Sequence, residues 1–141
     1  MLELARSDLM TRNVAVSIQL DTGAPPVLAD RVQMQQVVLN LIVNACEAMS
    51  EVAPVDRKLI IATRYSFRDR VIECSVMDSG SGIAEADLER IFQPFVTTKQ
   101  RGLGLGLAIC RSIVEAHGGR LWAERDAQRG ATVRFTARVD A

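Results

Sequence analysis

The sequence lacks an excess of charge of either sign, because 17 lysine and arginine residues balance 17 aspartate and glutamate residues. A strongly basic chain attracts nucleic acid and anionic lipid through its long-range field, and a neutral chain has no such field. We therefore expect no nucleic-acid partner and no electrostatic contact with a membrane. Any ligand must be sought through local groups of residues.

Long apolar runs are also missing. The apolar stretch VVLNLIV at residues 37–43 is far shorter than the roughly 20 residues that span a bilayer. Met1 opens no signal-peptide pattern. These absences predict a cytoplasmic location for this domain.

Cysteine is scarce and scattered. Cys46, Cys74 and Cys110 form no CxxC pair and are odd in number, so the sequence favours neither a disulfide framework nor a zinc site. We interpret all three as buried thiols in a reducing compartment.

The length of 141 residues is that of one ordinary domain, which buries about two-thirds of its unfolded surface. We interpret residues 1–12 as a linker and residues 13–141 as the domain. Periodicity predicts strands at residues 14–20, 58–67, 71–78, 120–125 and 131–139, and helices at residues 30–50, 85–92 and 105–117. Strands and helices are segregated, which favours an α+β two-layer sandwich with helices backing a mixed, mostly antiparallel sheet.

The helix predicted at residues 30–50 combines an apolar surface with one polar stripe. Asp30 is placed to cap its first turn, and apolar residues such as Val32 and Val43 cover most of its circumference, so we expect it to be largely buried. The stripe recurs at spacings of three and four and consists of Gln36, Asn40, Asn44 and Glu47. A solvated face is one interpretation. Asparagine has weak helix propensity, however, so two asparagines one turn apart favour a ligand surface whose neutral oxygens suit Mg²⁺ beside phosphates.

Two glycine motifs stand at the ends of predicted elements. In MDSGSGI, Asp78 ends a strand and Gly80 and Gly82 lie in the following turn, although Asp and Gly are common turn residues as well. In GLGLGLAIC, three glycines directly precede a helix, whose N-terminal N–H groups favour phosphate, with structural loop glycines as the alternative. Neither the Walker A pattern nor the dinucleotide fingerprint fits this loop.

Taken in order, NLIVNACEAM, DSGSGI, FQPFVTTK and GLGLGLAI resemble the N, G1, F and G2 boxes of histidine-kinase catalytic domains. The resemblance covers about residues 2–139, and TTK with EAHGG is similar to the nitrogen-regulation and oxygen-sensor branch of that family. It implies the Bergerat ATP-binding fold, a catalytic domain of a sensor histidine kinase in two-component signal transduction, and ATP and Mg²⁺ as ligands.

The resemblance also implies roles for single residues. Asn44 would coordinate Mg²⁺ and act in catalysis with Lys99, and Asn40 would support the metal site. Asp78 would accept a hydrogen bond from the adenine amino group, and Thr132 would share the water network around the adenine. The implied nucleotide-binding residues are Asn40, Asn44, Asp78, Gly80, Gly82, Ile83, Phe95, Thr98, Lys99, Gly102, Leu103, Gly104, Leu105, Gly106 and Thr132.

The resemblance also implies that Phe92 and Phe95 anchor the lid over the nucleotide. The sequence contains no match to the phosphoacceptor box. The one histidine, His117, precedes two glycines at a predicted helix end, where a C-terminal cap is the favoured interpretation. The resemblance places the acceptor histidine on a preceding helical hairpin that dimerises. We therefore expect a monomeric domain that does not autophosphorylate alone and that works with this hairpin and a response regulator receiver domain, in a kinase that can be membrane-anchored elsewhere.

Water-using relatives carry a glutamate at the position of Asn40, so the resemblance also implies slow intrinsic ATP hydrolysis. Two other functions fit parts of the sequence. LDTGA at Asp21 and MDSGS at Asp78 match the short signature of aspartic proteases, whose paired carboxylates share a proton, although the predicted helices argue against that class. A nucleotide-binding regulatory module or an anti-sigma-type serine kinase would use the same pocket with a different output.

Overall fold

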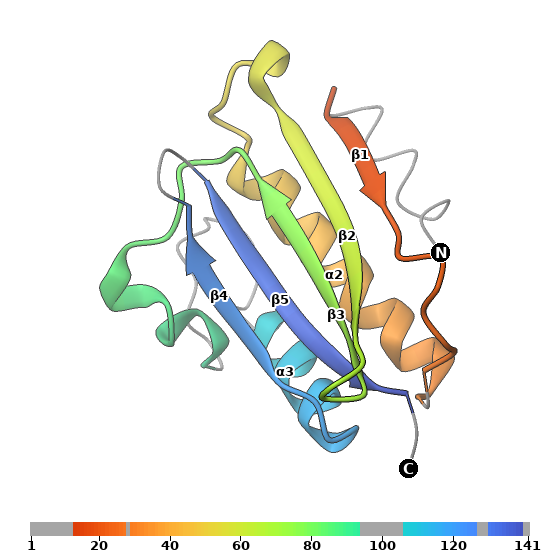
Figure 1. The fold of residues 1–141 in the computed structure, drawn as a ribbon. Coiled ribbons are helices and arrows are strands. Elements are labelled where there is room, and N and C mark those ends of the chain that lie inside the picture. The colour runs from red at the N-terminus through yellow and green to blue at the C-terminus, as the bar shows by residue number, and fades with distance from the viewer. Residues whose placement is uncertain (1–12, 28, 94–105, 127–129, 140–141) are drawn as a thin grey trace.

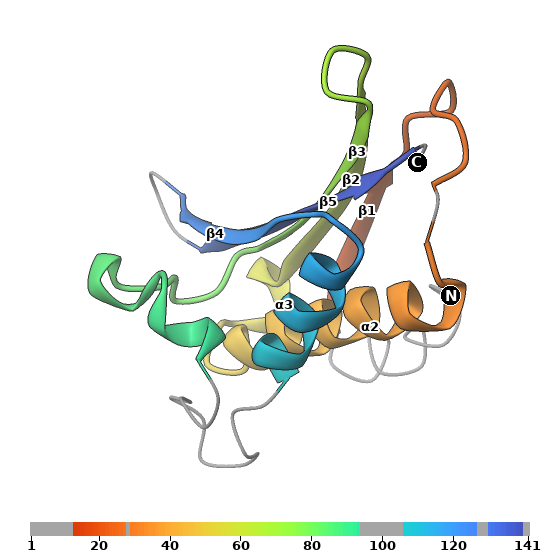
Figure 2. The same ribbon diagram turned by 90° about the horizontal axis from the view of Figure 1, so that it is seen from below.

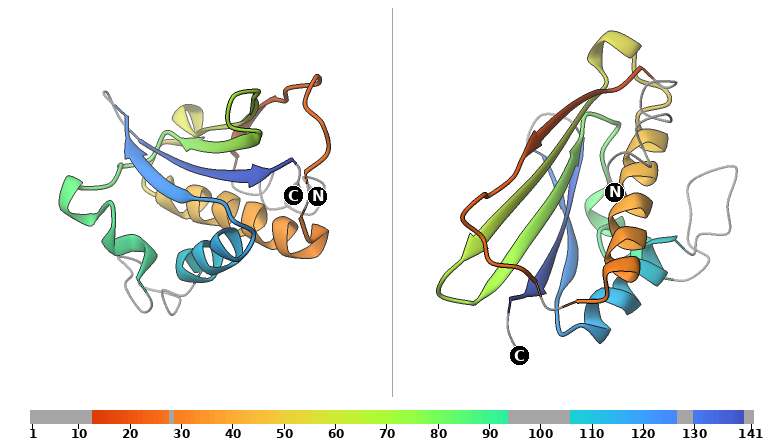
Figure 3. Two further views of the ribbon diagram at one scale, coloured as in Figure 1. Left: turned by 60° about the horizontal axis from the view of Figure 1, so that its bottom comes forward. Right: turned by 90° about the vertical axis from the view of Figure 1, so that its right-hand side faces the viewer.

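The computed structural model of the protein describes residues 13–27, 29–93, 106–126 and 130–139. In this part of the chain a sheet forms one layer and the helices form a second layer on one face of it, as Figures 2 and 3 show. The expected α+β two-layer sandwich is therefore confirmed. None of the described helices is long and apolar enough to cross a membrane.

The described strands form one five-stranded sheet in the order β1-β2-β3-β5-β4 (Figure 1). Their bounds are Ala15–Gln19 for β1, Lys58–Ser66 for β2, Val71–Asp78 for β3, Leu121–Arg125 for β4 and Ala131–Arg138 for β5. β1 is parallel to β2, and the other neighbours are antiparallel. Both predicted hairpins are present, and the last strand in the chain lies between β3 and β4.

The burial of β1 differs from the expectation of a half-buried strand. All five of its residues are exposed, including Val16 at 38% and Ile18 at 46%. β1 lies at the edge of the sheet, whereas α2 packs against β3, and α3 packs against β4 and β5. Apolar alternation predicted the strand correctly, but burial also requires a covering element.

Helix α2 spans Arg31–Ala48, and the Asp30 side chain caps it by accepting a hydrogen bond from Gln33 N at 3.0 Å. Its buried residues are Val37, Val38, Leu41, Ile42, Ala45 and Cys46. The expectation that the helix is largely buried fails at its first turn, where Val32 is 72% exposed. That turn projects past the sheet in Figure 1, and the buried residues of the helix begin at Val37 in its second turn.

Helix α3 spans Gly106–Ala116 and ends as predicted at two glycines. Gly118 has a φ of 76°, and Gly119 N donates to Val114 O at 2.9 Å, which closes the helix end. The helix predicted at residues 85–92 is instead two 3₁₀ turns, η2 (Glu85–Asp87) and η3 (Arg90–Phe92). Eight residues are too few to stabilise an α-helix by themselves, and single turns of the tighter helix replace it.

The core lies between the two layers and is built from apolar side chains of α2, α3 and the inner face of the sheet. Its largest fully buried apolar members include Leu41, Ile42, Met49, Leu59, Leu121 and Val114. Each such side chain contributes about 1.5–3 kcal/mol relative to exposure. The three cysteines are free and buried, as the sequence predicted.

Candidate functional site

The polar stripe of α2 lies partly covered at its junction with α3. Of its four members, Gln36 is exposed, whereas Asn40, Asn44 and Glu47 are half-buried. The Asn40 side chain hydrogen-bonds the sulfur of Cys110 in α3, and Cys110 Sγ lies 3.7 Å from Val37 O. The stripe is therefore not a uniformly solvated face, because its middle borders a second helix.

The loop after β3 lies directly against the C-terminal end of α2. A Cβ atom on Gly80 would lie 2.5 Å from Ala48 O, a distance that only glycine tolerates. Ala48 stands one turn after Asn44, so this contact brings the loop to the end of the polar stripe. Ser79 secures the same loop, because its hydroxyl lies 2.7 Å from Asp56 O and accepts from Lys58 N at 2.9 Å.

Asp78 is a buried carboxylate at the end of β3, with 8% of its surface exposed. Its Oδ1 accepts a hydrogen bond from Gly80 N at 2.8 Å. Burial raises the pKa of this carboxyl above its ordinary range, and Asp126 adds to the shift, while backbone hydrogen bonds from Gly80 and Ala131 oppose it. A carboxylate held in this way is suited to accept a hydrogen bond from a neutral ligand group.

Two backbone positions with positive φ shape the surroundings of Asp78. Gly82 has a φ of 85° and Gly130 has a φ of 93°, conformations that glycine adopts without strain. A Cβ atom on Gly82 would lie 3.2 Å from Gly130 O. The loop after β3 and the start of β5 are therefore in close contact, with Ile83 half-buried directly after Gly82.

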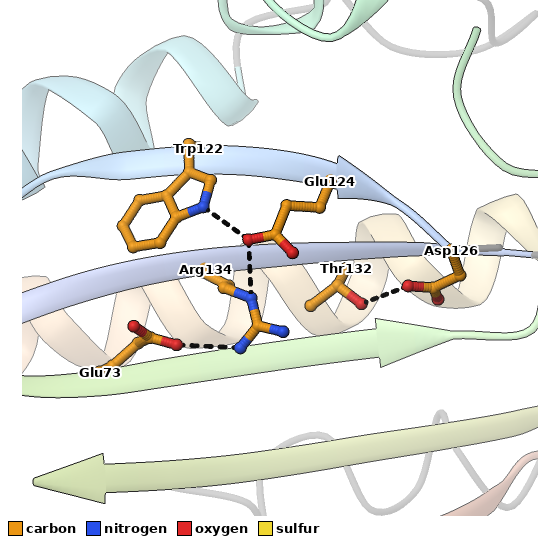
Figure 4. Close-up of polar contacts among 6 residues, drawn as sticks. All are labelled: Glu73, Trp122, Glu124, Asp126, Thr132 and Arg134. Carbon is orange, nitrogen blue, oxygen red and sulfur yellow. Dashed lines mark hydrogen bonds and ion pairs between the residues drawn. The ribbon is translucent and has the colours of Figure 1, made fainter. Parts of the chain in front are cut away.

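Thr132 does not join Asp78 in the way the sequence suggested. Ala131 is the residue paired with Asp78, and side chains alternate along a strand, so Thr132 points to the opposite face of the sheet. There its hydroxyl donates to Asp126 Oδ1 at 3.1 Å, as Figure 4 shows. The Thr132 side chain therefore lies on the face of the sheet opposite the Asp78 carboxylate, and its part in an adenine water network stays a prediction.

Phe92 is buried and lies against α3. Its ring is 3% exposed, and the guanidinium of Arg111 lies 4.9 Å from the ring centroid. Arg111 is itself held by ion pairs to Glu89 at 3.1 Å and Glu115 at 3.3 Å. These contacts attach η3 to the middle of α3.

Several implied site residues lie outside the described residues: Phe95, Thr98, Lys99, Gly102, Leu103, Gly104 and Leu105. Gly106 is described and is the first residue of α3. A Cβ atom there would meet no atom of the described residues within 4 Å.

His117 has a structural role at the end of α3. Its Nδ1 lies 2.7 Å from Ile113 O, and its Nε2 accepts from Asp30 N at 3.2 Å. These partners fit the neutral tautomer with the proton on Nδ1. The predicted cap is confirmed. His117 thus lies at the N-terminus of α2, and the rise of the helix separates this end from Ala48 by roughly 27 Å.

The arrangement excludes the carboxylate pair of an aspartic protease. Asp21 Oδ2 accepts from Tyr65 N at 3.0 Å, whereas Asp78 is paired with Leu59. Tyr65 and Leu59 are six residues apart on β2, which corresponds to roughly 20 Å. Two carboxylates at that separation do not share a proton.

Sequence reasoning missed the part that Gly130 and Asp126 take in this region. Gly130 directly precedes a predicted strand, and an isolated glycine there was a signal for close backbone approach. Asp126 had no comparable signal, because its contact with Thr132 depends on the pairing of β4 with β5.

The family model of the histidine kinase-, DNA gyrase B- and HSP90-like ATPases matches residues 29–141. Sensor protein FixL of Bradyrhizobium diazoefficiens is 50% identical over 125 residues, which are 89% of this chain and 24% of FixL. Sensor protein TdiS of Thauera aromatica is 42% identical over 129 residues, which are 92% of this chain and 24% of TdiS. The chain thus spans about a quarter of the length of these relatives.

Solved structures show the same arrangement of elements. The nucleotide-free catalytic domain of histidine kinase ThkA has a TM-score of 0.84 and 35% identity, covering 97% of this chain and 86% of that chain. Full-length ShkA in complex with AMPPNP has a TM-score of 0.83 and 27% identity, covering 99% of this chain and 29% of that chain.

Proposed function

Because this chain belongs to the family of histidine kinase-, DNA gyrase B- and HSP90-like ATPases, we propose that it binds MgATP and donates the γ-phosphoryl group to a histidine on a separate dimerisation domain. The observation that best supports this function is the contact of Gly80 with Ala48, which brings the Asp78 carboxylate to the asparagine stripe of α2. In this proposal residues 1–12 are the linker from the dimerisation domain and residues 13–141 are the catalytic domain.

The base would be held by the loop after β3. The Asp78 carboxylate is the acceptor for the adenine amino group, and the backbone at Gly80, Gly82 and Ile83 lies against the ring. A buried acceptor left without its donor is costly, by about 1–3 kcal/mol, so this one contact selects adenine over bases that lack the amino group. The lid residues and Gly106 would enclose the phosphates from the other side.

The metal would be held by Asn44, with Asn40 in support. Within the described ranges no three histidine, cysteine, aspartate or glutamate residues form a metal cluster. This donor set fits Mg²⁺, which retains water and binds through one or two protein oxygens together with substrate phosphates. When bound, the ion neutralises phosphate charge, and the chain's own contribution is to orient the nucleotide. Lys99 supplies a second cation in the proposed site.

The acceptor and the next partner lie on other molecules or domains. Histidine kinase ThkA has been solved in complex with response regulator protein TrrA. We therefore propose a dimerisation and histidine-phosphotransfer domain as the direct partner, and a response regulator receiver domain as the protein that next takes the phosphoryl group, on the cytoplasmic side of a full-length kinase.

Phosphotransfer from labelled ATP tests this function. The chain is mixed with Mg²⁺, ATP labelled at the γ-position and a purified helical hairpin that carries an acceptor histidine. We expect acid-labile label on the hairpin and none on this chain alone, with slow steady-state hydrolysis. An Asn44→Asp variant should fold normally but lose MgATP affinity, because it adds negative charge beside the phosphates.

Other products of the same assay would contradict the proposal in distinct ways. Acid-stable label on a partner serine would indicate an anti-sigma-type kinase. ATP binding without any transfer would indicate a regulatory module. Unchanged MgATP affinity in both Asn44→Asp and Asp78→Asn would reject the site itself.

A further inference from the structure

Gly130, directly before β5, lies directly behind the loop that carries Asp78. A Cβ atom on Gly130 would lie 2.1 Å from Asp78 O and 3.2 Å from Ser79 Cα, so the two backbones touch. On the other side, the Gly82 contact with Gly130 O closes the loop around the same residue. The position of Gly130 therefore sets where the loop from Asp78 to Gly82 can lie.

Gly130 is in turn held by the end of β4. Asp126 N donates to Gly130 O at 3.3 Å, and Asp126 Oδ1 accepts from the Thr132 hydroxyl at 3.1 Å. Thr132 is a fully buried polar residue, with 0% of its surface exposed. Figure 4 shows this pair at the end of the strands, separate from the ion pairs that join Arg134 to Glu73 and Glu124. Asp126 thus hydrogen-bonds both residues that flank Ala131, Gly130 and Thr132.

We propose that Thr132 and Asp126 are positioning residues for the proposed adenine site, acting through Gly130 on the loop from Asp78 to Gly82. Neither side chain touches the base. Their hydrogen bond fixes Gly130 from the far face of the sheet, and the loop from Asp78 to Gly82 is fixed against Gly130. The expected effect on nucleotide binding rests on the proposed function. The expected effect on the position of the loop from Asp78 to Gly82 does not.

A matched pair of threonine variants tests the inference. Thr132→Val removes the hydroxyl and keeps the shape, and Thr132→Ser keeps the hydroxyl. The control is Thr136→Val on the same strand and face, where Thr136 Oγ1 accepts from Arg120 N at 3.0 Å at the opposite end of β4. Both valine variants remove one hydrogen bond of the same hairpin, so they should lose similar global stability, and they differ in distance from Gly130.

The first measurement is amide hydrogen exchange of the 141-residue chain without nucleotide. Thr132→Val should accelerate exchange of the Gly80 N–H, which is bonded to Asp78, about two- to tenfold, the range of one lost hydrogen bond. Thr132→Ser should restore the wild-type rate, and Thr136→Val should leave it unchanged. Equal Gly80 exchange in both valine variants overturns the proposal, whether or not the chain binds ATP.

The second measurement is the affinity for ATP and ADP. Thr132→Val should weaken both about two- to tenfold by the same factor, because Gly130 lies behind the loop that would hold the base rather than the phosphates. Asp126→Asn retains an acceptor oxygen and should bind normally, whereas Asp126→Ala should match Thr132→Val, with no further loss in the double variant. Additive losses in the double variant overturn the proposed pair. Absence of ATP binding by the wild type rejects the proposed function, and the exchange result then stands separately.

Discussion

Replacing Gly80 with alanine should separate the loop after β3 from the end of α2. The new Cβ would lie 2.5 Å from Ala48 O and 2.9 Å from Ala48 C, and must retreat to at least 3.0 Å. Both atoms belong to the backbone of a buried helix end, so the loop has to move instead. Overpacking of this kind costs about 1–3 kcal/mol. In a domain of this size that lowers the melting temperature by about 4–12 °C.

Thermal unfolding followed by circular dichroism, with and without MgATP, measures both consequences. The matched control is Gly106→Ala in the second glycine motif, where the added Cβ meets no described atom within 4 Å and a first-turn alanine favours the helix. We expect Gly80→Ala to lose stability and also most of the nucleotide-induced rise in melting temperature, and Gly106→Ala to retain its stability. A Gly80→Ala protein that melts at the wild-type temperature and binds ATP normally would refute the reasoning.

Two further predictions concern buried ionisable groups. The pKa of Asp78 is raised in the fold, so the stability that this carboxyl contributes is present below the ordinary aspartate range and is lost as pH rises through the folded pKa. At neutral pH the charged, buried carboxylate therefore destabilises the fold, and Asp78→Asn should raise the melting temperature. The same variant should weaken ATP binding tenfold or more. A variant that is destabilised at neutral pH would show that this carboxylate supports the fold instead. Burial raises the pKa of Cys74 to about 12 and that of Cys110 to about 11, so both thiols should react with a thiol reagent at neutral pH only at the rate of unfolding, as mass spectrometry would show. Rapid labelling of either native thiol would contradict their burial.

The periodic elements were predictable from the sequence because their side chains alternate with the period of the structure that they adopt. The two hairpins and α2, with its Asp30 cap, follow directly from that rule. The exposure of β1 did not follow, because periodicity identifies a face but not the element that covers it. The same limit applies to Val32, which is apolar but lies on a turn beyond the sheet.

The face on which Thr132 lies was predictable in principle. Ala131, Val133 and Phe135 are apolar and alternate, which assigns them to the core and Thr132 to the other side. The resemblance of GATVRF to related ATPases implied a role for Thr132 but gave no information on the face to which its side chain points. Gly130 signalled a close backbone approach, but its partner Asp78 was not predictable, and neither was the contact of Gly80 with Ala48, because each joins segments that only the folded domain brings together.

The insertion of β5 between β3 and β4 has a consequence for synthesis. During translation β4 emerges before β5, the strand that joins it to the rest of the sheet. The surroundings of Asp78 are complete only when Ala131 of β5 pairs with it. A nascent chain should thus acquire affinity for nucleotide in a single late step rather than gradually. Ribosome-bound chains halted before residue 130 should accordingly fail to retain a fluorescent ATP analogue, and retention by such chains would show that the pocket forms earlier.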